Sequence, residues 1–230
     1  MTQPTLELRA VTYRYAAVRR PAIDDVSLAV GTGEIVGLTG ANDAGKSTLC
    51  LIAAGLAPTS VGGDLQGDVL IEGLSIRGLP THALGGRVGI VFAEPATQLS
   101  GVAASVFEEV ALGPVNLGCP RAETLERVTR TLDRLGISGL APRSPERLSG
   151  GQQQLVAIAS MLAMEPRVLV LDEPVAELDA EARRLVAEAL VAAAAAGTAV
   201  LVAEHDLDLL RSICDRIVGI DGGRLRGEPA

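Results

Sequence analysis

The residues best suited to chemistry lie in one stretch, Gly40 to Thr48, which reads Gly-Ala-Asn-Asp-Ala-Gly-Lys-Ser-Thr. Its spacing matches G-x-x-x-x-G-K-[ST], the pattern of a loop that holds phosphate groups. Glycines let the backbone curl around phosphate oxygens, and the N-terminus of a following helix adds the positive end of its dipole. An ordinary glycine turn before a helix is the simpler alternative. It is disfavoured because Lys46 and the Ser47 hydroxyl occupy the positions that the phosphate-loop pattern requires. The predicted phosphate-binding residues are Gly40, Ala41, Asn42, Asp43, Ala44, Gly45, Lys46, Ser47 and Thr48.

Lys46 is the only lysine in a chain with 20 lysines and arginines. In such a loop the lysine reaches the β- and γ-phosphates, and the Ser47 hydroxyl binds Mg²⁺. An ammonium is a compact point charge, whereas a guanidinium is planar and larger. A single lysine at this position therefore indicates that a compact cation is needed there.

Two polar groups follow apolar runs further along the chain. Asp172 and Glu173 come directly after residues 168–171, and His205 comes shortly after residues 199–203. The carboxyl ends of buried parallel strands line the crevice where α/β proteins bind ligands. We expect Asp172 to hold Mg²⁺ through water and Glu173 to polarise a water for attack on a γ-phosphate. We expect His205 to reach the same crevice, although a solvent-facing loop histidine is the plainer alternative.

A second possible anion site begins a helix at Ser149-Gly150-Gly151-Gln152. Ser149 is a good N-cap, and bare backbone N–H groups and the helix dipole favour an anion there. Two such sites in one chain suggest a nucleotide held between two subunits. A glycine-rich helix cap without a ligand remains open as the alternative.

Periodicity predicts the elements that position these groups. Residues 35–39 form an apolar strand before the phosphate loop, and residues 49–54 have a helical pattern after it. Alternation over residues 6–13 and 26–30 indicates antiparallel strands at the start of the chain. We also expect a loop at residues 58–67, strands at 68–71, 87–92, 168–173 and 199–203, helices within 103–136, 147–165 and 180–196, and a closing hairpin at 217–223.

Composition limits the classes of partner. A net charge of −8, a pI near 4.9 and 2% aromatic residues argue against a nucleic-acid surface. Three widely spaced cysteines favour a reduced, cytosolic compartment, and the N-terminus lacks the pattern of a signal peptide. Glu188 and Gly197 interrupt the apolar stretch 185–203, so we expect a helix, a turn and a strand rather than a membrane span.

Taken together, the motifs resemble the ATPase subunit of an ABC transporter over nearly the whole chain. They are the phosphate loop, then Leu-Ser-Gly-Gly-Gln-Gln-Gln, Val-Leu-Val-Leu-Asp-Glu-Pro, Glu-Leu-Asp and Glu-His-Asp, in that order. The stretches from Val91 to Leu99 and from Phe107 to Gly118 resemble the energy-coupling-factor importers, including the cobalt and nickel types.

The resemblance implies an α/β fold, a P-loop NTPase core with an N-terminal antiparallel β subdomain and an inserted α-helical subdomain. Residues 1–92 and 165–230 would form the core and the antiparallel β part. Residues 93–164 would form the Q-loop and the helical signature subdomain, within a single ABC ATPase domain of residues 1–230.

The resemblance also implies roles for residues, with ATP and Mg²⁺ as cofactors. Tyr15 would stack on adenine, Ser47 and Asp172 would hold the magnesium, and Glu173 would be the catalytic base. His205 would sense the γ-phosphate. The signature residues that would close over the ATP of the opposite subunit are Ser149, Gly150, Gly151 and Gln152, and Leu178-Asp179 would connect the two sites.

The implied partners are a second ABC ATPase, in a homodimer or heterodimer, and integral membrane transporter subunits. The implied location is the cytoplasmic face of the cell membrane, as a peripheral protein, with no nucleic acid bound. Helices of the membrane partner would lie in the groove near residues 93–98. The transported substrate is not encoded in this chain.

Three residues depart from the family pattern. Ala93 replaces a glutamine that normally touches Mg²⁺ and couples to the membrane partner, and Glu94 could substitute through water. Asp43 replaces a glycine, which brings a carboxylate near phosphates. Leu155 replaces an arginine after the signature. We still expect an active ATPase that energises import of a metal ion or vitamin.

Two alternatives stay open. One is a degenerate nucleotide-binding partner in a heterodimeric ABC ATPase. The other is a soluble, non-transport ABC protein of DNA repair or translation, which the single cassette, short insert and acidic charge disfavour.

Overall fold

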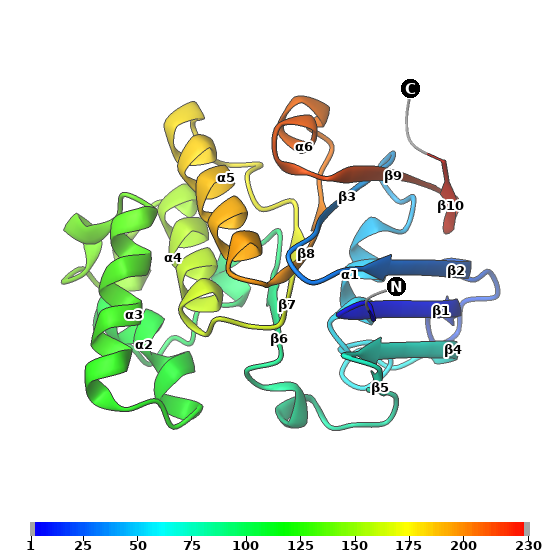
Figure 1. The fold of residues 1–230 in the computed structure, drawn as a ribbon, viewed down its shortest axis with the longest axis horizontal. Coiled ribbons are helices and arrows are strands. Elements are labelled where there is room, and N and C mark those ends of the chain that lie inside the picture. The colour runs from blue at the N-terminus through cyan, green and yellow to red at the C-terminus, as the bar shows by residue number, and fades with distance from the viewer. Residues whose placement is uncertain (1–2, 228–230) are drawn as a thin grey trace.

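Two β-sheets and a group of helices make up the protein, in a computed structural model that describes residues 3–227 (Figure 1). One sheet has six strands in the order β10-β9-β3-β8-β7-β6, and the other has four in the order β2-β1-β4-β5. The strands of the first sheet are β3 (Ile35–Thr39), β6 (Val88–Val91), β7 (Val168–Asp172), β8 (Ala199–Ala203), β9 (Arg216–Asp221) and β10 (Arg224–Arg226). Those of the second are β1 (Leu6–Arg14), β2 (Ile23–Val30), β4 (Asp64–Ile71) and β5 (Leu74–Ser75).

The parallel strands end at one edge because of their register. Leu38 of β3 and Asp172 of β7 both pair with Ala203, the last residue of β8. All five residues of β7 and of β8 are buried, as apolar runs covered on both faces should be. The phosphate loop, the two carboxylates and the Glu-His-Asp segment therefore leave the sheet side by side.

Each face of this sheet belongs to a different core. Val168 and Val170 pack with the antiparallel sheet and α1 (Lys46–Ala53), whereas Leu169 and Leu171 pack with the other α-helices. Alternate side chains of a strand point to opposite faces, so one apolar run serves both cores. These helices are α2 (Val106–Asn116), α3 (Arg121–Arg134), α4 (Gly150–Ala163), α5 (Ala180–Ala195) and α6 (Leu207–Ile213). In Figure 1, α2, α3 and α4 lie on the side of the molecule away from β1, β2 and β4.

The predicted loop at residues 58–67 is wrong in its second part. β4 begins at Asp64, which pairs with Arg14 of β1. The register shifts between Arg9 and Thr12, and opposite this shift Gly67 adopts a φ of 80°. A Cβ on Gly67 would come within 2.4 Å of the Arg9 and Ala10 carbonyl oxygens. The glycine thus lies in β4 opposite a bulge in β1, inside a strand whose first part the sequence pattern presented as a loop.

The other predicted elements are present within a few residues, and α6, which had not been predicted, follows β8 directly. The apolar stretch 185–203 comprises the end of α5, a turn and β8. Among the described residues, every helix is too short or too polar to cross a bilayer.

The dependence of the fold on the shared strand β7 can be tested at Leu169, which is fully buried. Leu169→Ala should lower the free energy of unfolding by about 2–5 kcal/mol, because a cavity replaces close contacts. Leu125→Ala, at a side chain on α3 that is 44% exposed, should cost less than about 0.5 kcal/mol. Urea unfolding followed by circular dichroism measures both, and equal losses would contradict the placement of Leu169 in the core.

Candidate functional site

A cleft of about 600 Å³ opens at the edge where the parallel strands end. Three predicted segments meet there, namely Tyr15 after β1, the loop before α1 and Glu173 after β7. The lining residues are Tyr15, Ala22, Asn42, Asp43, Gly45, Lys46, Ser47, Thr48 and Glu173. The structure therefore brings these three segments together at one cleft.

Glycine is required twice in the loop. At Gly40 a Cβ would lie 2.3 Å from the carbonyl oxygen of Ile220. Gly45 has a φ of 112°, and a Cβ there would lie 2.9 Å from the carbonyl oxygen of Ala22. The loop thus packs tightly against β9 and the chain before β2, which fixes the backbone N–H groups that would face phosphates.

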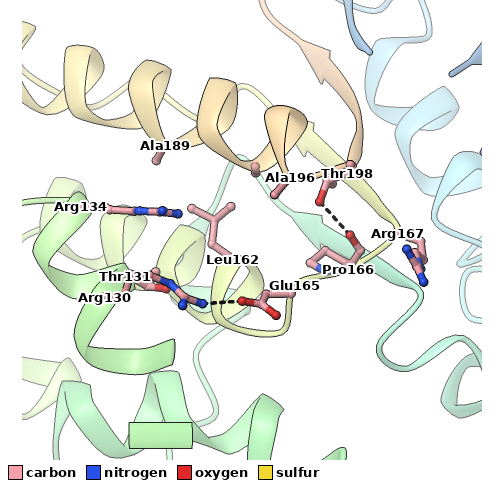
Figure 2. A pocket seen from close by; sticks show the side chains of 12 residues that line it. Arg130, Thr131, Arg134, Leu162, Glu165, Pro166, Arg167, Ala189, Ala196 and Thr198 are labelled. Carbon is pink, nitrogen blue, oxygen red and sulfur yellow. Dashed lines mark hydrogen bonds and ion pairs between the residues drawn. The ribbon is translucent and has the colours of Figure 1, made fainter. Parts of the chain in front are cut away.

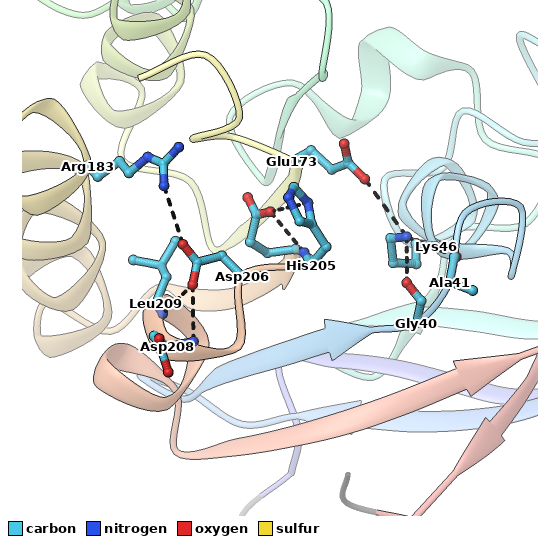
Figure 3. A network of polar contacts seen from close by, with 10 residues as sticks. Gly40, Ala41, Lys46, Glu173, Arg183, His205, Asp206, Asp208 and Leu209 are labelled. Carbon is cyan, nitrogen blue, oxygen red and sulfur yellow. Dashed lines mark hydrogen bonds and ion pairs between the residues drawn. The ribbon is translucent and has the colours of Figure 1, made fainter. Parts of the chain in front are cut away.

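The Lys46 ammonium is buried under the loop, and its side chain is only 5% exposed. It donates to the carbonyl oxygens of Gly40 (3.0 Å) and Ala41 (3.1 Å), and Glu173 Oε1 lies 3.8 Å away (Figure 3). The cation therefore stands between the carbonyl ends of its own loop and the carboxylate that follows β7. Such a closely coordinated position suits an ammonium better than a guanidinium.

Asp172, the last residue of β7, provides a second carboxylate at this edge of the sheet, although it does not line the cleft. Its side chain is buried, and Oδ1 has no hydrogen-bond partner among the described residues. Burial raises the pKa of Asp172, and the Ser47 hydroxyl opposes that rise. An unpartnered carboxylate oxygen beside a hydroxyl fits Mg²⁺, which prefers oxygen ligands and retains several waters.

No cluster of three or more histidine, cysteine or acidic side chains that could hold a metal occurs within residues 3–227. A dedicated protein cage for a metal is therefore absent from this part of the chain. Magnesium here would depend on Ser47, Asp172, water and the phosphates themselves, as is usual for a nucleotide-bound ion.

Tyr15 borders the cleft and is held from two sides. Its hydroxyl lies 3.1 Å from Thr48 Oγ1, and its ring meets the Tyr13 ring edge-on at a centroid distance of 5.0 Å. These contacts fix an aromatic side chain beside the phosphate loop. Adenine stacking on it stays a prediction.

Glu173 and His205 follow neighbouring strands. The Glu173 backbone adopts a φ of 49° and its N–H donates to the Ala203 carbonyl, so its side chain is held at the edge of the sheet. The His205 side chain is 63% exposed, and its Nδ1 lies 2.9 Å from Glu204 Oε1. Figure 3 shows Lys46, Glu173 and His205 at this edge. His205 is thus both exposed to solvent and adjacent to the cleft, although it does not line it.

The signature segment does not reach the cleft within one chain. Ser149 caps α4 in a capping box, in which the Gln152 N–H donates to Ser149 Oγ and the Ser149 N–H donates to Gln152 Oε1. The predicted N-cap is confirmed. Contact between this segment and a nucleotide on a second subunit remains a prediction.

Two of the three family departures have defined surroundings. Asp43 has a φ of 61°, is exposed and lines the cleft, so its carboxylate lies where repulsion of phosphates was anticipated. Leu155 is buried in the helical core, where it replaces a charge with apolar packing.

Ala93 is exposed, and nearby glutamines are engaged elsewhere. Gln98 Oε1 accepts from the Phe92 N–H, and its Nε2 donates to the Ile90 carbonyl. Gln154 of α4 donates to the Phe92 carbonyl at 3.4 Å. The sequence did not reveal these anchors of the segment after β6, because no motif distinguishes them from surface glutamines.

A second cavity, of about 430 Å³, lies between α3, the connection from α4 to β7, and α5 (Figure 2). Its polar groups are largely engaged with one another: Arg130 pairs with Glu165, and the Thr198 hydroxyl donates to the Pro166 carbonyl. None of the buried side-chain atoms left without a partner in the described chain lines it. It lacks the strand-end carboxylates, so we do not assign the site there.

The burial of the Asp172 carboxylate predicts how stability should depend on pH. A raised pKa in the folded state means that stability is lost as pH rises from the ordinary aspartate range through the folded pKa. At neutral pH, without Mg²⁺ or nucleotide, Asp172→Asn should therefore raise the unfolding midpoint, and the gain should vanish in acid. Asp221→Asn, at a side chain 74% exposed, is the control that should change little. Urea unfolding at several pH values measures this, and a neutral-pH loss in Asp172→Asn would contradict it.

Comparison with known proteins identifies the family of this chain. The family described as "ABC transporter" matches residues 23–176. A putative ABC transporter ATP-binding protein of Pyrococcus abyssi is 38% identical over 97% of this chain and 80% of its own length. An energy-coupling factor transporter ATP-binding protein, EcfA, of Methanothermobacter thermautotrophicus is 37% identical over 97% of this chain and 70% of its own.

Solved structures show the same fold. CbiO1 of Clostridium perfringens, part of the ABC transporter complex CbiONQ, superposes with a TM-score of 0.82 at 32% identity, covering 98% of this chain and 88% of its own. The ATP-binding cassette MJ0796, a dimer bound to ADP and Pi, superposes with a TM-score of 0.85 at 27% identity, covering 97% of each chain. With its phosphate loop, strand-end carboxylates and two-sheet fold, this chain belongs to the ABC transporter family and is one of its ATP-hydrolysing, ATP-binding subunits.

Proposed function

We propose that this chain binds MgATP in the cleft of about 600 Å³ and hydrolyses it to drive an energy-coupling-factor importer of a metal ion or vitamin. The main support for ATP hydrolysis is the set of charged groups at one edge of the sheet. The buried Lys46 ammonium lies 3.8 Å from Glu173 Oε1, and Asp172 Oδ1 has no partner among the described residues. The importer type rests on the likeness to EcfA and CbiO1 and on the Val91–Leu99 and Phe107–Gly118 motifs.

Each site residue has a role in this proposal. The loop N–H groups and Lys46 bind and orient the phosphates, Ser47 and Asp172 hold Mg²⁺, and Tyr15 stacks on the adenine ring. Magnesium supplies charge neutralisation at the phosphates when it is bound. Glu173 orients and deprotonates the attacking water, since its side chain is only 30% exposed and stands beside the lysine.

A second subunit completes the site. MJ0796 forms a dimer, and a matching dimer here would bring Ser149 to Gln152 of one chain over the ATP of the other. Besides the Gln152 N–H, which donates to the capping Ser149 hydroxyl, the N–H groups at the start of α4 offer an anion site for the ATP of a second subunit. Membrane subunits would dock near residues 93–98, which places the protein at the cytoplasmic face of the membrane. Within the single domain, residues 1–92 and 165–230 form the core and the antiparallel β part in this proposal, and residues 93–164 form the Q-loop and the helical signature subdomain.

One observation favours a second candidate, a degenerate partner in a heterodimer. Ala93 offers no side-chain ligand, and Gln98 cannot substitute while both its amide groups bond to the backbone of residues 90–92. Hydrolysis measured for the chain alone and mixed with its partner ATPase separates the two. Turnover only in the mixture would favour the degenerate partner.

The assignment of the base is tested by Glu173→Gln. ATP turnover of the purified dimer should fall by at least about 100-fold while ATP binding persists, because the amide cannot take the proton of the water. Glu126→Gln, at an exposed glutamate of α3, is the matched control and should hydrolyse normally. Equal rates for Glu173→Gln and the unaltered chain would refute the role.

The need for a compact cation is tested by Lys46→Arg. Both Lys46→Arg and Lys46→Ala should weaken ATP binding by roughly 10-fold or more. The alanine variant loses the positive charge, and the guanidinium of the arginine variant does not fit between the Gly40 and Ala41 carbonyls. Equilibrium binding of a fluorescent ATP analogue measures this. Wild-type affinity in the arginine variant would show that charge alone suffices.

A further inference from the structure

Glu204 is a fully buried carboxylate that the proposed chemistry does not use. It follows β8, whose five residues are all buried, and its own side chain is 0% exposed. Removing a carboxylate from water is costly unless it is paired and hydrogen-bonded. A glutamate at this position therefore calls for a specific reason.

The contacts of Glu204 are one-sided. Oε1 accepts from the His205 backbone N–H at 2.9 Å and lies 2.9 Å from His205 Nδ1. Oε2 is buried and has no hydrogen-bond partner among the described residues. Nearly all the compensation for burying this group thus comes from His205.

The backbone of Glu204 is fixed to the strand that leads into the phosphate loop. Its N–H donates to the carbonyl of Leu38 in β3, at 3.0 Å, and on the other side the Glu173 N–H donates to the Ala203 carbonyl at 2.9 Å. The carboxylate therefore sits on a rigid frame between β3 and β7. A buried acceptor on such a frame holds a neighbouring imidazole in one orientation.

We propose that Glu204 is a positioning residue that sets the orientation and the tautomer of His205. Its carboxylate takes the Nδ1–H, which leaves Nε2 as the ring nitrogen available to the cleft. The other side of the ring is exposed, and the His205 side chain, 63% exposed, has no contact of comparable strength elsewhere in residues 3–227. This inference rests on the proposed ATPase, in which Nε2, an acceptor in this tautomer, would reach the terminal phosphate through a water that donates to both.

The tautomer can be measured without any hydrolysis. The chain has two histidines, so His82→Asn leaves one imidazole, whose nitrogens are resolved by NMR of ¹⁵N-histidine-labelled protein. A free neutral imidazole favours the Nε2–H form, whereas we expect Nδ1–H at His205. Glu204→Leu should return the ring toward the free form. Finding Nε2–H in the chain with Glu204 intact would overturn the proposal, even if the leucine variant failed to fold.

A double-mutant cycle separates positioning from a merely structural role. Glu204→Leu should lower kcat by roughly 10- to 100-fold with little change in KM for ATP, and Glu204→Gln, which keeps an acceptor oxygen, should recover much of the loss. In a chain that already carries His205→Ala, adding Glu204→Leu should not lower kcat any further. An equal loss in both backgrounds would overturn the proposal.

Two controls keep the outcomes distinct. Glu188→Gln, at a side chain of α5 that is 60% exposed, should hydrolyse ATP like the unaltered chain. If the unaltered chain hydrolyses no ATP, either alone or mixed with its partner ATPase, the proposed function fails. The tautomer measurement still decides the role of Glu204 in that case.

Discussion

The register of three parallel strands is the constraint on which this protein depends. β3, β7 and β8 pair so that Leu38, Asp172 and Ala203 lie abreast, and each strand then releases a polar segment at the same edge. A slip of one residue would turn each apolar run to the wrong core and would carry Asp172 away from Ser47. The chemistry is therefore assembled by backbone pairing, and the side chains inherit their positions from it.

The same edge concentrates the polar groups that the fold leaves unsatisfied. Oδ1 of Asp172, at the end of β7, and Oε2 of Glu204, directly after β8, are buried without partners among the described residues. Within residues 3–227, Oε1 of Gln154 is the one other buried side-chain oxygen or nitrogen without a partner, in keeping with the rarity of such atoms in folded proteins. Sites that must bind charged ligands carry such costs, and a ligand that satisfies these atoms adds its binding free energy to the stability of the fold.

The sequence predicted the parts of the site whose spacing is dictated by chemistry. The loop from Gly40 to Thr48, the N-cap at Ser149 and the strand ending at Asp172 needed only local pattern, because glycine, capping hydroxyl and apolar run each have one physical reason to occur there. It failed where tertiary contact decides. Gly67 was assigned to a loop because it lies opposite a bulge in β1 that only strand pairing reveals. The burial of Glu204 was not predicted, because it depends on the contact with β3.

The glutamines show the same limit from another direction. Ala93 can be recognised as a departure from sequence, but only the fold shows that Gln98 and Gln154 are both tied to the backbone around Phe92. Gln154 belongs to α4, the helix that begins with the signature serine, so the segment after β6 is joined to the helix that would face a second subunit. A helix that carries both contacts gives a physical route by which closing over ATP could move this segment, even though the Ala93 methyl group has no atom to bind the nucleotide or its ion.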